Sequence, residues 1–342
     1  MSEAGMKGRS PLLWCVLGAA LVAVFFLSLG VGRFAIAPGA VWDILVSAAL
    51  GSPAHDMAST VVLELRLPRT LLAMLVGAGL ALSGAVYQGI FRNPLVSPDV
   101  LGVSSGAGFG AVLGILLWGT GSGTSVIAFV CGMASVGLAY YFSRSRGCVS
   151  MMSLVLSGII ISSIFSALIS LVKYAADPYD KLPAITYWLM GSLGKADFDR
   201  LQVIALPMFA AGAFLLAMRW RINILSLGEE EARSLGVNPA RIRNIAIIAA
   251  TVLTALSVTA CGIVGWVGLV IPHMCRRIVG VDHARLLPAA CLVGAIFLAL
   301  VDICARSLLA AELPIGILTA LLGAPFFAFL LKHTREKQGD WS

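Results

Sequence analysis

Charged residues are scarce in this chain. Only 12% of its 342 residues are Asp, Glu, Lys or Arg, whereas 59% are hydrophobic. A soluble domain carries about 25% charged residues, so this composition could not cover the surface of a water-soluble fold. The 36 glycines point the same way, because glycine is commoner in membrane helices than in soluble ones. The sequence therefore predicts an all-α polytopic membrane protein, with a single transmembrane domain over residues 1–342.

The motifs of several enzyme classes are also missing. The seven cysteines form no CxxC pair, and the four histidines form neither HExxH nor another metal-binding spacing. No GxxxxGK[ST] phosphate loop occurs, and the nearest string, Gly191 to Lys195, has the wrong spacing. We therefore expect no catalytic residue, no metal site and no cofactor bound by this chain. Orientation in a bilayer explains the net charge of +7 better than a nucleic-acid partner does.

Charge-free windows predict ten membrane spans, since one span needs about 20 mostly apolar residues. Residues 100–143 are long enough for two spans with a turn at 119–124. The window 244–275 is awkward for two full spans. We nevertheless predict two spans here, the second being a short, glycine-rich helix that ends at Pro272. With two spans, the arginines that follow lie on the inner side. The other predicted spans are 10–32, 70–91, 147–172, 201–218, 286–301 and 313–331.

Positive charge divides unequally between the two sides of this arrangement. With both termini on the inner side, 16 of the 24 Lys and Arg residues fall on inner segments and 8 on outer segments. An excess of Lys and Arg marks cytoplasmic loops. We therefore expect a multi-pass protein of the cytoplasmic (inner) membrane with both termini in the cytoplasm. The charged segment SLGEEEARSLGV, residues 226–237, lies on the same side.

This charged segment predicts a short cytoplasmic helix at about 226–236. Ser226 and Glu229 match a capping box, and the three consecutive glutamates lie where the helix dipole favours anions. Arg233 follows Glu229 by four residues, and Gly236 is a suitable helix stop. Such a helix could be an inert connector or a handle that docks on a soluble partner. The caps at both ends slightly favour the handle.

Four stretches of the chain resemble one transporter family. GEEEARSLG (228–236) is similar to the GExxAxxLG coupling segment of permease subunits in ATP-binding-cassette importers for iron chelates, haem and vitamin B12. The stretch 65–108, with LRLPRTLLAMLVGAG and FRNPLVSPD, resembles the most recognisable block of that family. GIVGWVGLVIPHMCRRIVGVDHARLLP (262–288) and DICARSLLAAELPIGILTALLGAPFFAFLL (302–331) resemble two further blocks in the same order.

The resemblance implies a ten-span permease like that of the vitamin B12 importer. Such permeases form homodimers with the pathway at the dimer axis, and each coupling helix fits a cleft in one of two separate ATPase subunits. ATP and Mg²⁺ would then be bound by those ATPases and not by this chain. The positions taken as the ATPase-coupling segment are Ser226, Gly228, Glu229, Glu230, Ala232, Arg233, Leu235 and Gly236.

On the outer side, the family docks an extracytoplasmic substrate-binding protein through arginines that meet glutamates. The matching positions are Arg66, Arg69 and Arg306. From the residues alone these arginines could instead anchor the protein at the membrane interface, and Arg306 has Asp302 four residues before it as a partner. A surface helix is also expected on this side at about 182–194, because Tyr187 and Trp188 suit the interface.

The resemblance also places a translocation gate on the cytoplasmic side. The first gate layer matches Asn93 and Leu95, in the proline-rich break after the second span. The second layer matches Ser150 and Met151, although the family is often rich in Ser and Thr there and Met151 departs from that pattern.

The cargo implied by the resemblance is a metal chelate. The family transports ferric siderophores, haem, corrinoids and, in some members, oxyanions of molybdenum or tungsten. Family frequency favours a ferric siderophore. The alternative from another class is an ion-coupled secondary transporter, which would need an acid or a broken-helix ion site near the midplane. No Asp, Glu, Lys, Arg or His lies in the middle of a predicted span, which counts against proton coupling, and a channel would leave the coupling segment unexplained.

Overall fold

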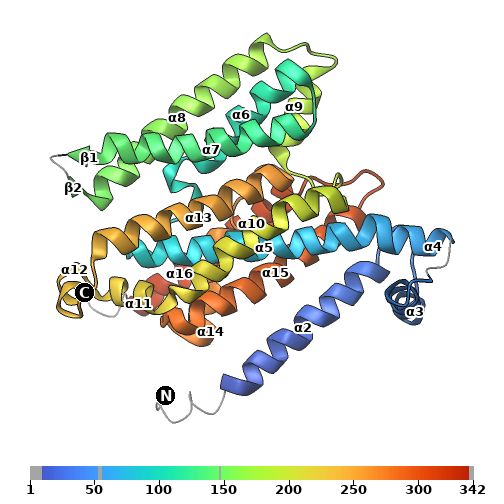
Figure 1. The fold of residues 1–342 in the computed structure, drawn as a ribbon, viewed down its shortest axis with the longest axis horizontal. Coiled ribbons are helices and arrows are strands. Elements are labelled where there is room, and N and C mark those ends of the chain that lie inside the picture. Colours follow the sequence, from blue (N-terminus) through green and yellow to red (C-terminus); the bar gives the residue numbers. More distant parts are fainter. Residues whose placement is uncertain (1–9, 53–55, 146–147, 339–342) are drawn as a thin grey trace.

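The computed structural model describes residues 10–52, 56–145 and 148–338, which are mostly helical (Figure 1). The helices are α2 (Ser10–Gly30), α3 (Pro38–Ala49), α4 (Met57–Thr60), α5 (Leu67–Ile90), α6 (Val103–Trp118), α7 (Ser122–Ser143), α8 (Met151–Ala175), α9 (Lys181–Met190), α10 (Phe198–Ala217), α11 (Arg219–Leu227), α12 (Glu229–Ser234), α13 (Pro239–Cys261), α14 (Val267–Val279), α15 (His283–Ser307) and α16 (Ile315–Gln338). A π-helical turn (Val61–Arg66) joins α4 to α5, and a 3₁₀ turn (Pro98–Leu101) precedes α6. Between α7 and α8, the two-residue strands β1 (Arg144–Ser145) and β2 (Cys148–Val149) pair antiparallel.

Each of the ten predicted spans corresponds to a helix of the described chain. Seven helical stretches are long and apolar enough to cross a membrane: α2, the stretch Met57–Ile90 that ends with α5, α7, α8, α10, α13 and α15. α6 and the stretch Ile315–Phe329 of α16 are shorter apolar helices, and α14 has only 13 residues. The structure thus confirms the all-α polytopic fold, and α9 corresponds to the helix expected at about 182–194. Three helices were not predicted: α3, with too few residues for a span, the four-residue α4, and α11.

The window that was awkward for two full spans does hold two helices. Gly262 ends α13 with a φ of 78°, a conformation that favours glycine. The expectation that the second helix ends at Pro272 is wrong, because α14 continues to Val279. A proline inside a helix frees the carbonyl four residues earlier, here that of Gly268. The side-chain amide of Gln88 in α5 donates to this oxygen at 3.4 Å, so the freed acceptor has a partner.

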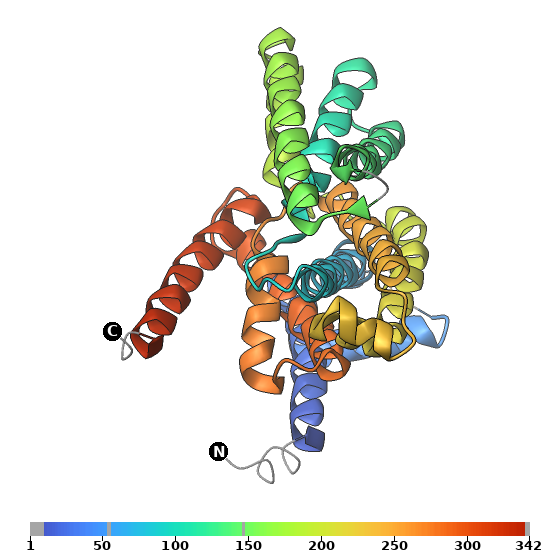
Figure 2. The same ribbon diagram turned by 90° about the vertical axis from the view of Figure 1, so that its left-hand side faces the viewer.

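α5 is the central helix of the molecule (Figure 2). It packs against α10, α13, α14 and α15, and every residue from Gly79 to Ile90 is buried. Glycines permit this close packing, since Gly77 lies against Gly294 of α15 and Gly84 against Gly268 of α14. α6, α7 and α8 pack on one another in the upper part of Figure 1, and α6 and α7 also contact α13.

The two ends of the helix bundle differ in charge. In Figure 1, α2 begins and α16 ends on the left, where α12 and the β1–β2 pair also lie, whereas α3, α4 and α9 lie at the opposite end. We call these the inner and the outer end. The predicted inner arginines that lie in or directly beside helices at the inner end are Arg92, Arg144, Arg219, Arg221, Arg233, Arg241, Arg243, Arg276, Arg277 and Arg285. Lys7, Arg9 and Arg146, also counted as inner, lie outside the described residues, and Lys332, Arg335 and Lys337 belong to the last part of α16. Orientation in the membrane stays a prediction.

Candidate functional site

The acidic segment forms helix α12 at the inner end, between α11 and α13 (Figure 1). α12 runs only from Glu229 to Ser234, so it is shorter than predicted. The predicted capping box is wrong, because Ser226 lies in the last turn of α11, where its hydroxyl donates to the carbonyl of Asn223 at 2.7 Å. Gly228 separates the two helices with a φ of 153°, and no side chain caps α12 at its start.

The end of α12 has the predicted glycine stop. Gly236 has a φ of 75°, and its N–H donates to the carbonyl of Arg233 at 3.0 Å. The N–H of Val237 donates to the carbonyl of Ala232 at 2.9 Å. These two bonds form a Schellman motif, which satisfies carbonyls that the end of a helix otherwise leaves without partners.

Two arginines hold the first residue of α12. Nη1 of Arg243, in α13, lies 2.5 Å from Oε1 of Glu229, and Nη2 of Arg233 lies 3.5 Å from Oε2. The second contact is the predicted pair four residues apart. Arg243 is only 8% exposed, and Ala232 is fully buried. α12 is therefore anchored along one side, while Glu230, Glu231 and Leu235 remain exposed.

The predicted gate residues after α5 lie on a turn at the inner end. Oδ1 of Asn93 accepts a hydrogen bond from the N–H of Leu95 at 2.9 Å, the pattern of an Asx turn. Arg92, just before it, has a φ of 51°, which is uncommon for a residue with a side chain. The Gln88 amide donates to the carbonyl of Val96 at 3.1 Å. These bonds fix the turn and leave Leu95 exposed.

The second predicted gate layer lies at the start of α8. Ser150 is the exposed residue that precedes the helix, and Met151 is its first residue. A cavity of about 350 Å³ is lined by Met151 together with Ile90, Phe91, Arg92, Leu225, Glu229 and Arg243. The start of α8, the turn after α5 and the first residue of α12 thus border one cavity.

Asp99 is half-buried in the 3₁₀ turn between α5 and α6. Burial raises the pKa of its carboxyl above the ordinary value, because the charged form loses its hydration. The hydroxyl of Ser104 donates to this carboxylate and lowers the pKa in part.

Arg66, at the outer end, is bound to backbone carbonyls. It is 6% exposed, and its guanidinium donates to the carbonyls of Leu29 at 2.7 Å, Gly30 at 3.0 Å and Phe34 at 2.5 Å. Leu29 and Gly30 end α2, where carbonyls have no partners within the helix. Arg66 therefore ties the end of α2 to the π-helical turn that precedes α5.

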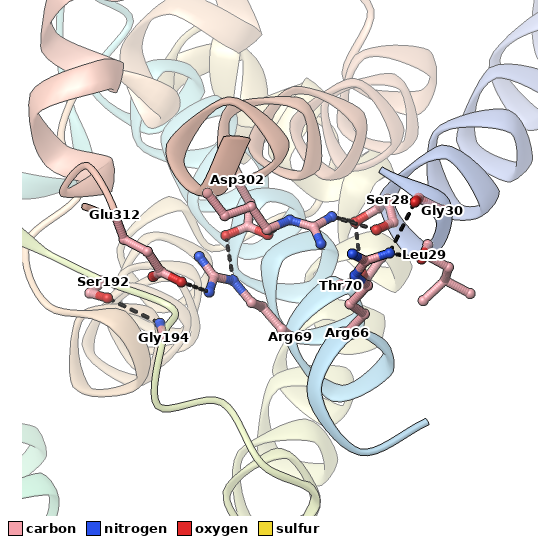
Figure 3. A network of polar contacts seen from close by, with 11 residues as sticks. Ser28, Leu29, Gly30, Arg66, Arg69, Thr70, Ser192, Gly194, Asp302 and Glu312 are labelled. Carbon is pink, nitrogen blue, oxygen red and sulfur yellow. Dashed lines mark hydrogen bonds and ion pairs between the residues drawn. The ribbon is translucent and has the colours of Figure 1, made fainter. Parts of the chain in front are cut away.

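Arg69 and Arg306 share one buried carboxylate, that of Asp302 (Figure 3). Nε of Arg69 donates to Oδ1 of Asp302 at 2.9 Å, and Nε of Arg306 lies 3.4 Å from Oδ2. The second contact confirms the predicted pair between Asp302 and Arg306. Arg306 also donates to the hydroxyl of Ser28 at 2.8 Å, and Nη1 of Arg69 donates to Oε1 of Glu312 at 2.9 Å.

The structure thus brings the three predicted docking arginines into one network and buries most of each. The side chain of Arg69 is 11% exposed, and Arg66 and Arg306 are less exposed still. Their docking role stays a prediction. Sequence reasoning missed Glu312 as a partner of Arg69, because a pair 243 positions apart leaves no local pattern.

The structure also limits where a metal could bind. Among the side chains that the structure describes, in residues 11–52, 56–144 and 150–329, no group of three or more His, Cys, Asp or Glu is placed to hold a metal ion.

Comparison with known proteins covers nearly the whole chain. The model of the FecCD transport family matches residues 20–333. The molybdate import permease of Haemophilus influenzae is 44% identical over 311 residues, which are 91% of this chain and 92% of that protein. The Fe(3+)-citrate import permease of Bacillus subtilis is 36% identical and covers 99% of this chain and 100% of its own.

The fold of this chain matches that of a solved transporter structure. It is described as an inward-facing conformation of a metal-chelate type ABC transporter, is 42% identical, and matches with a TM-score of 0.86 over 94% of this chain and 99% of its own. The chain therefore belongs to the FecCD transport family.

Proposed function

We propose that this chain is the transmembrane permease subunit of an ATP-driven importer in the cytoplasmic membrane. Two copies enclose the pathway, and two separate ATPase subunits bind ATP and Mg²⁺. An extracytoplasmic binding protein delivers the substrate, and the permease itself makes and breaks no covalent bond. Membership of the FecCD transport family supports this proposal, as does the fold match to an ABC transporter.

The observation that carries the proposal is the structure of α12. A helix of six residues is too short to be stable by itself, yet a Schellman motif and the contact with Arg243 hold it in place. It presents two acids and Leu235 outward at the end expected to face the cytoplasm. This combination of a fixed backbone, exposed charge and an exposed apolar side chain suits insertion into a cleft of an ATPase.

The same contacts offer a route from the ATPase to the gate. Movement of α12 would pull on α13 through the pair of Glu229 and Arg243. It would also change the cavity that Glu229 shares with Arg92 and Met151. We propose that Asn93, Leu95, Ser150 and Met151 widen or narrow the cytoplasmic exit in response.

The outer end is proposed to receive the binding protein. Arg66, Arg69 and Arg306 line a cavity of about 300 Å³ together with the exposed Arg33. Such a concentration of guanidinium groups suits carboxylates on a partner, because each group can donate two parallel hydrogen bonds. Added salt is expected to weaken this docking.

The proposed substrate is a metal chelate, with a ferric siderophore first and haem or cobalamin as further members of the class. A protein named for Fe(3+)-citrate import, matched over the full length, supports the iron chelate. A second candidate is an oxyanion such as molybdate, which the relative of 44% identity favours.

Reconstitution tests both the energy source and the cargo. The permease is placed in proteoliposomes with and without its ATPase and binding protein, and uptake of ⁵⁵Fe-siderophore and ⁹⁹Mo-molybdate is compared. We expect uptake of one cargo that needs ATP, the ATPase and the binding protein. Uptake driven by a proton or sodium gradient without the ATPase would contradict the proposal and favour the ion-coupled alternative.

A further inference from the structure

The cavity at the outer end has an unusual charge balance. Among the described residues that line it are four arginines (Arg33, Arg66, Arg69 and Arg306) and one acid, Glu312. Arg66 donates to backbone carbonyls, and the exposed Arg33 donates to the carbonyls of Leu309 and Ala310. Carbonyls satisfy hydrogen bonds but carry no net charge, so the walls of the cavity keep an excess of positive charge.

Glu312 differs from the other acid of the network in its setting. Asp302 is fully buried within α15, whereas Glu312 lies on the loop between α15 and α16 and its side chain is 43% exposed. Oε1 of Glu312 accepts from Nη1 of Arg69, and Oε2 lies beside Gly194 (Figure 3). Arg69 is thus held by a permanent partner, Asp302, through Nε and by a loop residue through Nη1.

We infer that Glu312 occupies the position on Arg69 that a carboxylate of the binding protein takes on docking. When the binding protein docks, its carboxylate replaces that of Glu312. The inference rests on the proposed docking role of the outer arginines. The exchange replaces one charge-assisted hydrogen bond with another, so it needs no unpaired intermediate inside the bundle. Asp302 keeps Arg69 in position during the exchange.

Release of Glu312 would free a contact that constrains the loop before α16. This loop is also held where the N–H of Leu313 donates to the carbonyl of Ala305 at 3.0 Å, and the N–H of Ile315, the first residue of α16, donates to that of Gly191 at 3.0 Å. Gly191 directly follows α9. Docking would therefore act on the junction of α9 and α16, while Arg33 continues to hold the carbonyls of the loop.

The test measures the affinity of the purified binding protein that supports uptake in the reconstituted system. The permease–ATPase complex in lipid nanodiscs is compared with its Glu312→Gln and Glu64→Gln variants. Glu64 is the matched control, because it is an exposed outer glutamate in the turn before α5 that does not line the cavity. We expect Glu312→Gln to tighten docking about fivefold at low salt, and Glu64→Gln to change it by less than about twofold.

Two outcomes overturn the inference. If Glu312→Gln leaves the affinity within the range of the control, Glu312 does not compete with the partner. If it weakens docking, Glu312 supports the docking surface instead of occupying it.

A third variant separates this inference from the docking proposal. Arg69→Lys keeps the charge but loses the planar fork of donors. If the arginines are the docking site and only the role of Glu312 is wrong, Arg69→Lys weakens docking while Glu312→Gln fails to tighten it. If the docking proposal itself is wrong, both variants and added salt leave the affinity unchanged, and size-exclusion profiles confirm that the variants are folded.

Discussion

The inner and outer ends of the molecule use charge in opposite ways. At the inner end, α12 presents glutamates outward, and the arginine that anchors it, Arg243, is buried. At the outer end the arginines are buried, and the acid that meets them at the surface, Glu312, is exposed. α12 therefore offers an acidic surface at an inner end that is otherwise rich in exposed arginines, whereas the outer network is a covered basic surface.

This difference explains why the exposure of the inner glutamates could be predicted from the sequence, whereas the partners of the outer arginines could not. Consecutive glutamates must stay exposed, because nothing nearby in the sequence could neutralise all three if they were buried. An arginine can be buried when its apolar stem packs and its five donors find oxygen acceptors. Those acceptors come from distant segments, as the contact between Arg66 and the end of α2 shows.

The largest effect is expected from breaking the outer network at its centre. Asp302→Asn removes the charge shared by Arg69 and Arg306, both largely buried, and should lower the free energy of unfolding by about 3–5 kcal/mol. Thermal unfolding in detergent measures this loss. Asp43→Asn, an exposed control on α3, should change stability by less than about 0.5 kcal/mol. Equal shifts for the two variants would show that the network does not hold the outer end together.

An intermediate effect is expected where α12 meets α13. Arg243→Gln removes the buried partner of Glu229 and should destabilise the local position of α12 by about 1.5–3 kcal/mol. Hydrogen exchange of residues 229–236 should quicken, and less substrate should be transported for each ATP hydrolysed. Arg241→Gln, an exposed control on the same helix, should leave both measurements near wild type. Loss of transport without faster exchange would mean that Arg243 does not act through α12.

The smallest effect on stability is expected at Ser226, the serine that precedes α12. Ser226→Ala should cost less than about 0.5 kcal/mol, because the serine caps no helix. Asn238→Ala should cost about 1 kcal/mol, because Oδ1 of Asn238 accepts from the N–H of Arg241 at the start of α13. Paired thermal scans compare the two. If Ser226→Ala lowered the free energy of unfolding as much as Asn238→Ala does, Ser226 would act as a helix cap, as the sequence predicted and the structure contradicts.

The elements predicted correctly are those with a local physical cause. Long charge-free windows gave the ten helices, and the glycine stop at Gly236 follows from conformational freedom at a single residue. The errors arose where contacts with a distant segment determine the local structure. α14 continues through Pro272 because the side-chain amide of Gln88 donates to the freed carbonyl. Ser226 lies in α11, a helix that no short-range sequence pattern predicted.

The central claim is that α12 is the handle by which a separate ATPase drives the permease. The most direct measurement is co-purification of the ATPase with the double variant Glu230→Lys and Leu235→Asp, which alters two exposed positions of the segment. We expect the ATPase to detach or its ATP hydrolysis to uncouple from transport, while thermal unfolding of the permease stays unchanged. Undiminished co-purification together with normal ATP-dependent uptake would contradict it.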